Sequence, residues 1–225
     1  MITAALYITI FGYSLGNRIS SIQDVSYMHF LIPGLVMMSV INGSYSNTSS
    51  SLYSQRFQGH IQELLVSSMS TFEIVLAIIL GGVLRGVLVG SLVATACIVL
   101  ADIPLLHLGI TLFFAVFVAV IFSCAGFISA VWAQDFDRLS LFQTYILSPM
   151  TYLGGVFFSV QMLPPLWQKV ALANPVLYFV NGLRFGFLGV TDINVQVAEV
   201  AVVIIAVIMF LICYRLFHIG YNIKT

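Results

Sequence analysis

The sequence predicts an all-α, polytopic membrane protein with six transmembrane helices in one domain, residues 1–225. Composition is the first observation: 60% of the residues are hydrophobic and 7% are charged, with eight basic and eight acidic side chains. A soluble domain carries about 25% charged residues, so a soluble globule is excluded. The second observation is a series of long apolar stretches joined by short loops. The net charge of zero leaves no basic face for nucleic acid.

Six stretches approach the length of about 20 apolar residues that a membrane-spanning helix needs. They are residues 1–15, 28–52, 74–101, 106–133, 139–158 and 197–217. The first is short and has no basic flank or cleavage site of a signal peptide, so we expect the chain to begin inside its first helix. Cytoplasmic ends put Arg56, Arg138, Arg215 and Lys224 inside and Arg18, Lys169 and Arg184 outside, a weak positive-inside bias.

The second span becomes polar halfway, from Asn42 to Ser51. A polar half-span is costly in lipid, so we expect it to face other helices or a water-filled cavity. Two interpretations stay open: hydrogen bonding between helices, or a translocation path that includes Asn42 and Tyr45.

Arg85 lies 11 residues after Ile74, about 16 Å along a helix and near the middle of the third span. A central arginine costs at least about 2.5–3.5 kcal/mol on insertion scales, so it should face the bundle interior or water. The expected partners are Asn42, Ser44 or Tyr45, backbone carbonyls or substrate. The residue has either a structural role or a role in substrate passage and gating.

Small residues repeat around Arg85 at every fourth position. They are Gly82, Gly86, Gly90 and Ala94. This spacing lets two helices approach closely, although the sequence does not identify the partner helix. Cys97, Cys124 and Cys213 lie in apolar stretches without metal-type spacing and are expected to be buried.

A short amphipathic helix is expected in the loop from Arg56 to Ser68. Ile61, Leu64, Leu65 and Ser68 share one helical face. The segment is either an interfacial anchor or a docking element for a soluble partner.

The longest connection, residues 159–194, contains a second pattern of short helices. Pro165 can occupy the first position of a helix, and Trp167 and Lys169 are typical of a membrane interface. Asn174-Pro175 interrupts the chain, and the apolar run that follows, 176–189, is too short to span. We therefore expect a re-entrant helical pair, the second helix dipping into the outer leaflet.

Several motifs in this order resemble the type-2 ABC transporter permeases, and their YadH-like branch in particular. No single piece is highly specific, but the order and spacing are. The pieces are Phe30-Leu-Ile-Pro-Gly-Leu-Val-Met-Met-Ser39, Arg56-x-x-Gly59 with Glu63-Leu-Leu65, Leu147-Ser-Pro-Met-Thr-Tyr-Leu-Gly-Gly-Val-Phe157, Leu163-Pro-Pro165, Asn174-Pro175 and Gly182-Leu-Arg184.

The resemblance implies a permease subunit of an ATP-driven exporter in the bacterial inner membrane. Two permease copies, in a homodimer, would each dock an ATP-binding cassette subunit that holds ATP and magnesium. Two sets of residues follow from it. The coupling residues would be Arg56, Gly59, Glu63, Leu64 and Leu65, and the outer gate would be Tyr178, Asn181 and Arg184. The alternative role for the three gate residues is to make structural contacts within the fold.

Two departures from the family pattern are visible. Ser68 and Ser70 stand where relatives often have prolines, which would leave the end of the coupling helix less rigid. The family's amphipathic helix before the first span is absent from the sequence as given.

No enzyme or cofactor motif is present in the chain. There is no G-x-x-x-x-G-K-[ST] loop to cradle phosphate, and His29, His60, His107 and His218 are scattered. An ion-driven secondary transporter would need acidic or histidine relays in mid-membrane, which the spans lack. A non-transporting scaffold is the other alternative. Membrane lipid is an expected partner, and nucleic acid is not.

Overall fold

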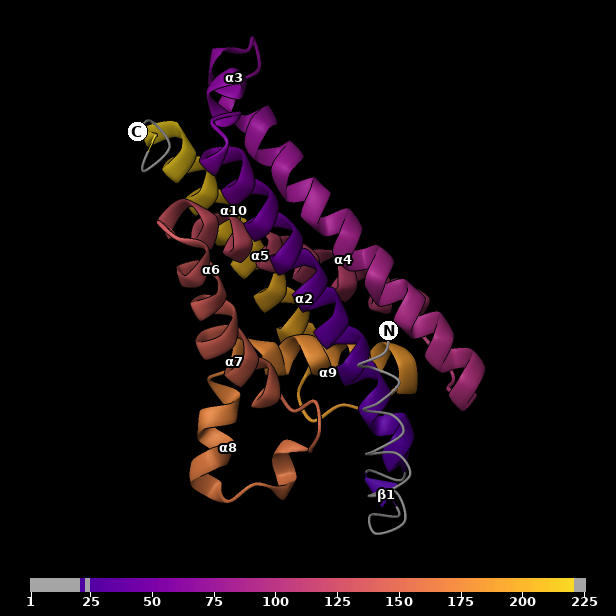
Figure 1. The fold of residues 1–225 in the computed structure, drawn as a ribbon. Coiled ribbons are helices and arrows are strands. Elements are labelled where there is room, and N and C mark those ends of the chain that lie inside the picture. The colour runs from indigo at the N-terminus through magenta and orange to yellow at the C-terminus, as the bar shows by residue number, and fades with distance from the viewer. Residues whose placement is uncertain (1–20, 23–24, 221–225) are drawn as a thin grey trace.

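A computed structural model of the chain describes residues 21–22 and 25–220, and this part is almost entirely helical (Figure 1). Its strands are β1 (Ser21–Ile22) and β2 (Val25–Ser26), which form one short antiparallel ladder. The predicted span 1–15 and the charges Arg18 and Lys224 lie outside the described residues. Within them, the expectation of an all-α protein is confirmed.

Four long helices build the bundle. They are α2 (Tyr27–Phe57), α4 (Thr71–Ala101), α5 (Leu108–Trp132) and α10 (Val195–Ile219). In the described part, α4, α5 and α10 are long and apolar enough to cross a membrane. The short helix α3 (Ile61–Val66) and the end of α10 lie at one end of the molecule (Figure 1).

The fifth predicted span is shorter than the sequence indicates and is not uniformly α-helical. It consists of α6 (Phe136–Phe142), a π turn η2 (Gln143–Leu147) and α7 (Ser148–Tyr152) in unbroken succession. The Ser148 hydroxyl donates to the Gln143 carbonyl at 3.0 Å. The helix ends at Tyr152 rather than at Phe158 because Gly155 takes a left-handed conformation, with φ of 73°, and turns the chain.

The connection to α10 contains a 3₁₀ turn η3 (Val160–Met162) and the helices α8 (Pro165–Leu172) and α9 (Pro175–Leu188). Pro165 begins α8, as predicted. Asn174 begins α9: its Oδ1 accepts from the Val176 amide at 3.0 Å, and its Nδ2 donates to the Met150 carbonyl at 2.7 Å. The 14 residues of α9 cover about 21 Å, less than the hydrocarbon core of a bilayer.

Helix α2 lies at the centre of the bundle and packs on α4 and α5 with almost no space between the backbones. A Cβ on Gly86 of α4 would overlap Ser44 Oγ and stand 3.0 Å from the Val40 carbonyl oxygen, and one on Gly126 of α5 would lie 2.6 Å from the Tyr45 carbonyl oxygen. The glycine stripe of α4 therefore receives α2 of the same chain.

The remaining core is mostly apolar. Cys97, Cys124 and Cys213 are buried in it, as expected, and the Cys213 thiol donates to the Cys124 carbonyl at 3.4 Å.

The glycine contact between α2 and α4 predicts opposite effects for two neighbouring substitutions. Gly86→Ala should lower the free energy of unfolding by about 1–3 kcal/mol because its methyl group has no space. Gly81→Ala, whose Cβ would lie 3.9 Å from the nearest atom, Asn47 Nδ2, should leave stability unchanged or slightly higher. Thermal melts in detergent measure both, at about 2–4 °C per kcal/mol. Equal melting midpoints for the two variants would contradict the close contact.

Candidate functional site

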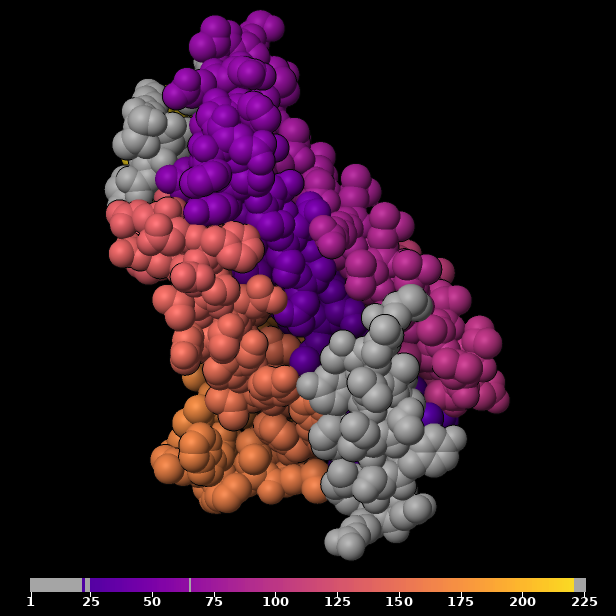
Figure 2. All heavy atoms as spheres, in the orientation of Figure 1, coloured from indigo at the N-terminus to yellow at the C-terminus, as the bar shows by residue number. Residues whose placement is uncertain are grey.

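One side of α2 carries a continuous row of small polar side chains, which we call the polar stripe. Its members are Ser39, Asn42, Ser46, Asn47, Ser50, Ser51 and Ser54, all half-buried or exposed. They recur at helical spacing, whereas Ile41, Thr48 and Leu52 on the other side are buried. Figure 2 shows the open face of α2 between α4 on one side and α6–α7 on the other.

Some donors in the polar stripe are satisfied within α2 itself. Asn42 Nδ2 donates to the Met38 carbonyl at 2.9 Å, and Ser50 Oγ donates to the Ser46 carbonyl at 2.6 Å. Across to the π turn, Gln143 Nε2 donates to Ser46 Oγ at 3.4 Å. The polar stripe therefore combines hydrogen bonds within α2 with hydrogen bonds from neighbouring elements.

Tyr45, expected beside Asn42, lies on the buried side of α2. Its hydroxyl donates to the Leu139 carbonyl at 3.4 Å, and its ring stacks on Phe142 with centroids 5.6 Å apart. Tyr45 thus joins α2 to α6 and does not contribute to the polar stripe.

Arg85 is exposed on the α4 edge of the polar stripe, 14 residues after Thr71 and 16 before Ala101. Its Nη1 donates to Asn47 Oδ1 at 3.0 Å. The expectation that Ser44, Tyr45 or Asn42 is the hydrogen-bond partner of Arg85 is wrong. Ser44 and Tyr45 lie on the buried sides of α2, and Asn42 donates to a carbonyl of its own helix. Of the two expected positions, the bundle interior or water, the interior of the single chain does not apply, because Arg85 is exposed.

The predicted coupling residues lie at the end of the molecule where α2 turns into α3 and α4. Arg56 belongs to α2, and its Nη1 donates to the carbonyls of Ala130 and, at 3.2 Å, Ala133. These are free carbonyls at the carboxyl end of α5, so Arg56 ties α2 to α5. Gly59, with φ of 78°, forms the turn between α2 and α3.

Because Gly59 separates the two helices, α3 covers only Ile61–Val66 rather than the predicted Arg56–Val66. Glu63 on α3 is exposed and Leu64 is half-buried, and Leu65 belongs to the same helix. Beside them Phe57 and Val66 are 82% and 88% exposed. This end of the chain therefore presents apolar side chains beside the carboxylate of Glu63.

Ser70, which replaces an expected proline, begins α4. Its Oγ accepts from the Glu73 amide at 3.3 Å, and the Glu73 carboxylate accepts from the Ser70 amide at 2.7 Å, forming a capping box. The start of α4 is thus fixed by hydrogen bonds in place of a proline ring.

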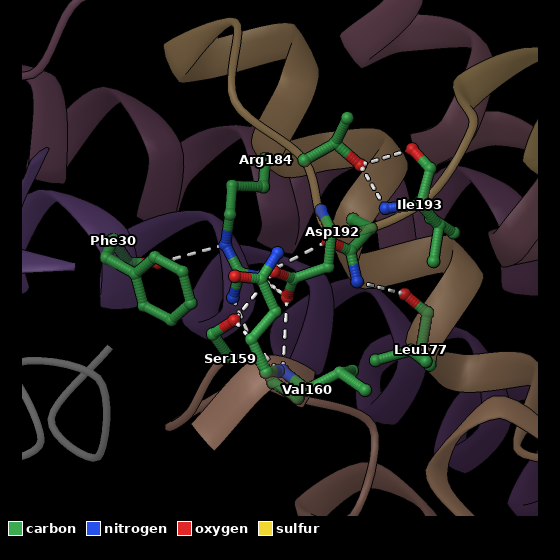
Figure 3. Close-up of polar contacts among 11 residues, drawn as sticks. Phe30, Ser159, Val160, Leu177, Arg184, Asp192 and Ile193 are labelled. Atoms are coloured by element: carbon green, nitrogen blue, oxygen red, sulfur yellow. Dashed lines mark hydrogen bonds and ion pairs between the residues drawn. The ribbon is translucent and has the colours of Figure 1, made fainter. Parts of the chain in front are cut away.

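A buried polar network at the other end of the bundle contains two of the predicted gate residues (Figure 3). The side chain of Arg184 is 0% exposed, and its guanidinium lies 3.6 Å from the centroid of the Phe30 ring. Arg184 Nη2 donates to the Gly155 carbonyl at 2.7 Å. Arg184 Nη1 lies 3.9 Å from Asp192 Oδ2, whose side chain is 1% exposed.

Asp192 connects this arginine to the surrounding loops. Ser159 Oγ donates to Asp192 Oδ1 at 2.6 Å, and the Val160 amide donates to Oδ2 at 3.3 Å. The Asp192 amide donates to Asn181 Oδ1 at 3.0 Å. Sequence reasoning missed Asp192, although an acidic residue eight positions from Arg184 in an otherwise apolar region was a usable signal.

Tyr178, the third predicted gate residue, lies outside this network. Its hydroxyl donates to the Leu172 carbonyl at 3.0 Å and joins α9 to α8. Arg184 and Asn181 therefore hold α9 against α2 and the loop before α10, while Tyr178 fixes the turn between the two short helices.

No group of three His, Cys, Asp or Glu side chains in the described ranges lies close enough to hold a metal ion. A groove of about 280 Å³ lies between α2 and α4, from Leu64 and Met69 at the α3 end to Asn47 and Gly81 near Arg85.

Comparison with known proteins identifies the class. The model of the ABC-2 type transporter family matches residues 1–188, and the chain belongs to that family. The inner membrane transport permease YadH of Escherichia coli K12 is 40% identical over 225 residues, covering 100% of this chain and 88% of that protein. Nodulation protein J of Rhizobium leguminosarum bv. viciae is 24% identical over 209 residues, 92% and 80% of the two chains.

The chain is accordingly the membrane permease subunit of an ABC transporter and a multi-pass protein of the bacterial inner membrane. Its family is one of transport permeases rather than catalytic enzymes, and membership implies association with an ATP-binding cassette subunit.

The buried ion pair predicts a large loss of stability when one partner is neutralised. Asp192→Asn leaves the buried guanidinium of Arg184 without its counter-charge, which should cost about 3–5 kcal/mol. The matched control is Asp135→Asn, because the Arg138–Asp135 pair has a similar separation, 3.8 Å, and side chains that are 45% and 71% exposed. It should cost less than about 1 kcal/mol. Thermal melts of the purified variants compare the two, and similar losses would contradict the prediction.

Proposed function

We propose that two copies of this permease and two ATP-binding cassette subunits form an ATP-driven exporter. In this proposal residues 1–225 form one domain with six spans, and α8 and α9 form the re-entrant pair at the outer face. The partner subunits hold ATP and magnesium. The observation that carries the proposal is the polar stripe on the open face of α2.

The position of the polar stripe favours a path between two copies. The stripe and Arg85 lie at the level of the long apolar helices, where lipid contact with polar groups is costly. A second copy applied to the same face would remove both from lipid and enclose a polar passage. Because this interface would use one patch twice, a symmetric dimer is the simplest assembly.

The contacts of the α3 end support a route for coupling. An ATP-binding cassette subunit that presses on α3 would act through the Gly59 turn on the end of α2. Arg56 bonds this end to α5, so α2 and α5 would move together. Movement of α2 shifts the polar stripe against its counterpart in the second copy and switches the passage between inward-open and outward-open states.

Two other functions, an ion-driven transporter and a scaffold without transport, fit the charged residues of the helices less well. A proton- or ion-driven transporter would use acidic side chains in mid-membrane. In the described helices, the acidic residues lie near helix ends, with Glu73 and Glu199 in the first five residues of α4 and α10. A scaffold without transport gives no reason for an exposed arginine halfway along α4.

The proposal predicts where the ATP-binding cassette subunit binds. The tagged permease is co-expressed with the ATPase encoded beside its gene, and the complex is isolated in detergent. We expect a stoichiometric ATPase with the unmodified chain and a loss of at least tenfold after Glu63→Ala and Leu64→Ala together, because Glu63 is exposed on α3 and Leu64 is half-buried beside it.

The control for this experiment alters a matched pair at the opposite end. Gln161→Ala with Met162→Ala changes one polar and one apolar exposed side chain of η3 and should leave recovery unchanged. Absence of ATPase with the unmodified chain would contradict the exporter. Equal recovery from both double variants would contradict the position of the docking site.

A further inference from the structure

We propose that Arg85 and Asn47 bind the phosphate headgroup of an exported amphiphile; this rests on the proposed function and names the class of its substrate. The two side chains come from different helices, α4 and α2, and meet on the edge of the polar stripe. A phosphate monoester on a hydrocarbon chain fits the donors, the charge and the groove that meet there.

The hydrogen-bonding chemistry of the pair leaves only donors for a ligand. A guanidinium has five N–H donors and no acceptor, so Asn47 must present Oδ1 to Arg85. The amide nitrogen of Asn47 then remains as a donor beside Gly81, in line with its 3.9 Å approach to the Cβ that Gly81 would carry. The unused N–H groups of Arg85 and this amide converge on a ligand that accepts hydrogen bonds.

The charge of the site also requires an anion. Arg85 has no acidic partner within the described residues, and its guanidinium donates to a neutral amide, that of Asn47. A symmetric dimer closed over the polar stripe brings a second Arg85 toward the same passage. A phosphate monoester, with a charge of about −1.5 to −2, would compensate both guanidinium groups and accept bidentate hydrogen bonds from them.

The groove that leads to the site has one polar and one apolar side. Asn47, Ser51 and Gln55 line it from α2. From α4 the lining residues are Ile74, Ala77, Ile78 and Gly81. Gln55 Oε1 is buried and has no hydrogen-bond partner among the described residues, so the polar side has capacity for a ligand hydroxyl. Such a groove accommodates a hydrocarbon chain along α4 while its headgroup remains with Arg85.

The groove also begins at the coupling end of the chain. Leu64 of α3 and Met69 before α4 form its outer limit. A ligand in the groove therefore touches the segment that would meet the ATP-binding cassette subunit, so occupancy and hydrolysis would be linked.

The test uses the permease–ATPase complex in discs of phosphatidylcholine and three probes. These are dodecyl phosphate, dodecyl glucoside as an uncharged amphiphile with the same chain, and inorganic phosphate. Thermophoresis gives the dissociation constants, and the ATPase rate is followed in parallel. We expect dodecyl phosphate to bind at least tenfold more tightly than either other probe and to raise the ATPase rate.

Substitutions then locate the binding. Arg85→Gln and Asn47→Asp should each weaken dodecyl phosphate at least tenfold without changing dodecyl glucoside, the second because it places a carboxylate in the site. The control Arg138→Gln removes an exposed guanidinium from α6 and should change nothing. Melting midpoints of all variants identify any that fail to fold. If one of Arg85→Gln and Asn47→Asp fails to fold, the other still tests the binding of dodecyl phosphate.

The outcomes that contradict the phosphate site differ from the outcome that contradicts the exporter. Equal binding of the two dodecyl probes would reduce the site to an apolar groove, and equal binding of inorganic phosphate would assign it to free phosphate; either overturns the proposal. Unchanged binding in both variants overturns it as well. A complex without ATPase instead contradicts the proposed exporter, while binding of dodecyl phosphate to the isolated permease still decides the present inference.

Discussion

The close packing of α2 against α4 and α5 is the constraint on which the rest of the structure depends. Gly86 and Gly126 leave no space for a Cβ between the backbones, so the rotation of α2 about its axis is fixed within narrow limits. With that rotation set, the hydroxyls of Ser44 and Thr48 are enclosed between helices, and Ser46, Asn47 and their neighbours are left on the open face. The polar stripe follows from the glycines on the opposite side.

The same constraint connects the two ends of the chain. Helix α2 is packed on both sides and, with Pro33 inside it, extends from the Phe30 contact with Arg184 to the Arg56 contact with α5. In the proposed coupling, a displacement near Gly59 would be carried along α2 toward the buried network around Arg184 and Asp192. Coupling over this distance requires stiffness, which tight glycine packing supplies more effectively than a core of flexible side chains.

Much of the fold could be predicted from the sequence because its signals are local. Apolar length marks the long helices, and Pro165 and Asn174 mark the starts of α8 and α9. What sequence reasoning missed depends on three-dimensional contacts. Asp192 became important only when the chain folded back on Arg184, and Asn47 replaced Ser44 as the partner of Arg85 because the rotation of α2 is set by glycines on another helix.

Two arginines, Arg184 of α9 and Arg85 of α4, show how the structure separates packing from function. Arg184 is fully enclosed, lies on an aromatic ring and has a carboxylate and carbonyl oxygens as partners, so its charge is compensated within the chain. Arg85 is exposed, donates to the amide oxygen of Asn47 and lies halfway along α4. An uncompensated arginine at this depth costs at least about 2.5–3.5 kcal/mol on insertion scales. The proposed ligand would complete the coordination of Arg85, as Asp192 and the carbonyl oxygens complete that of Arg184.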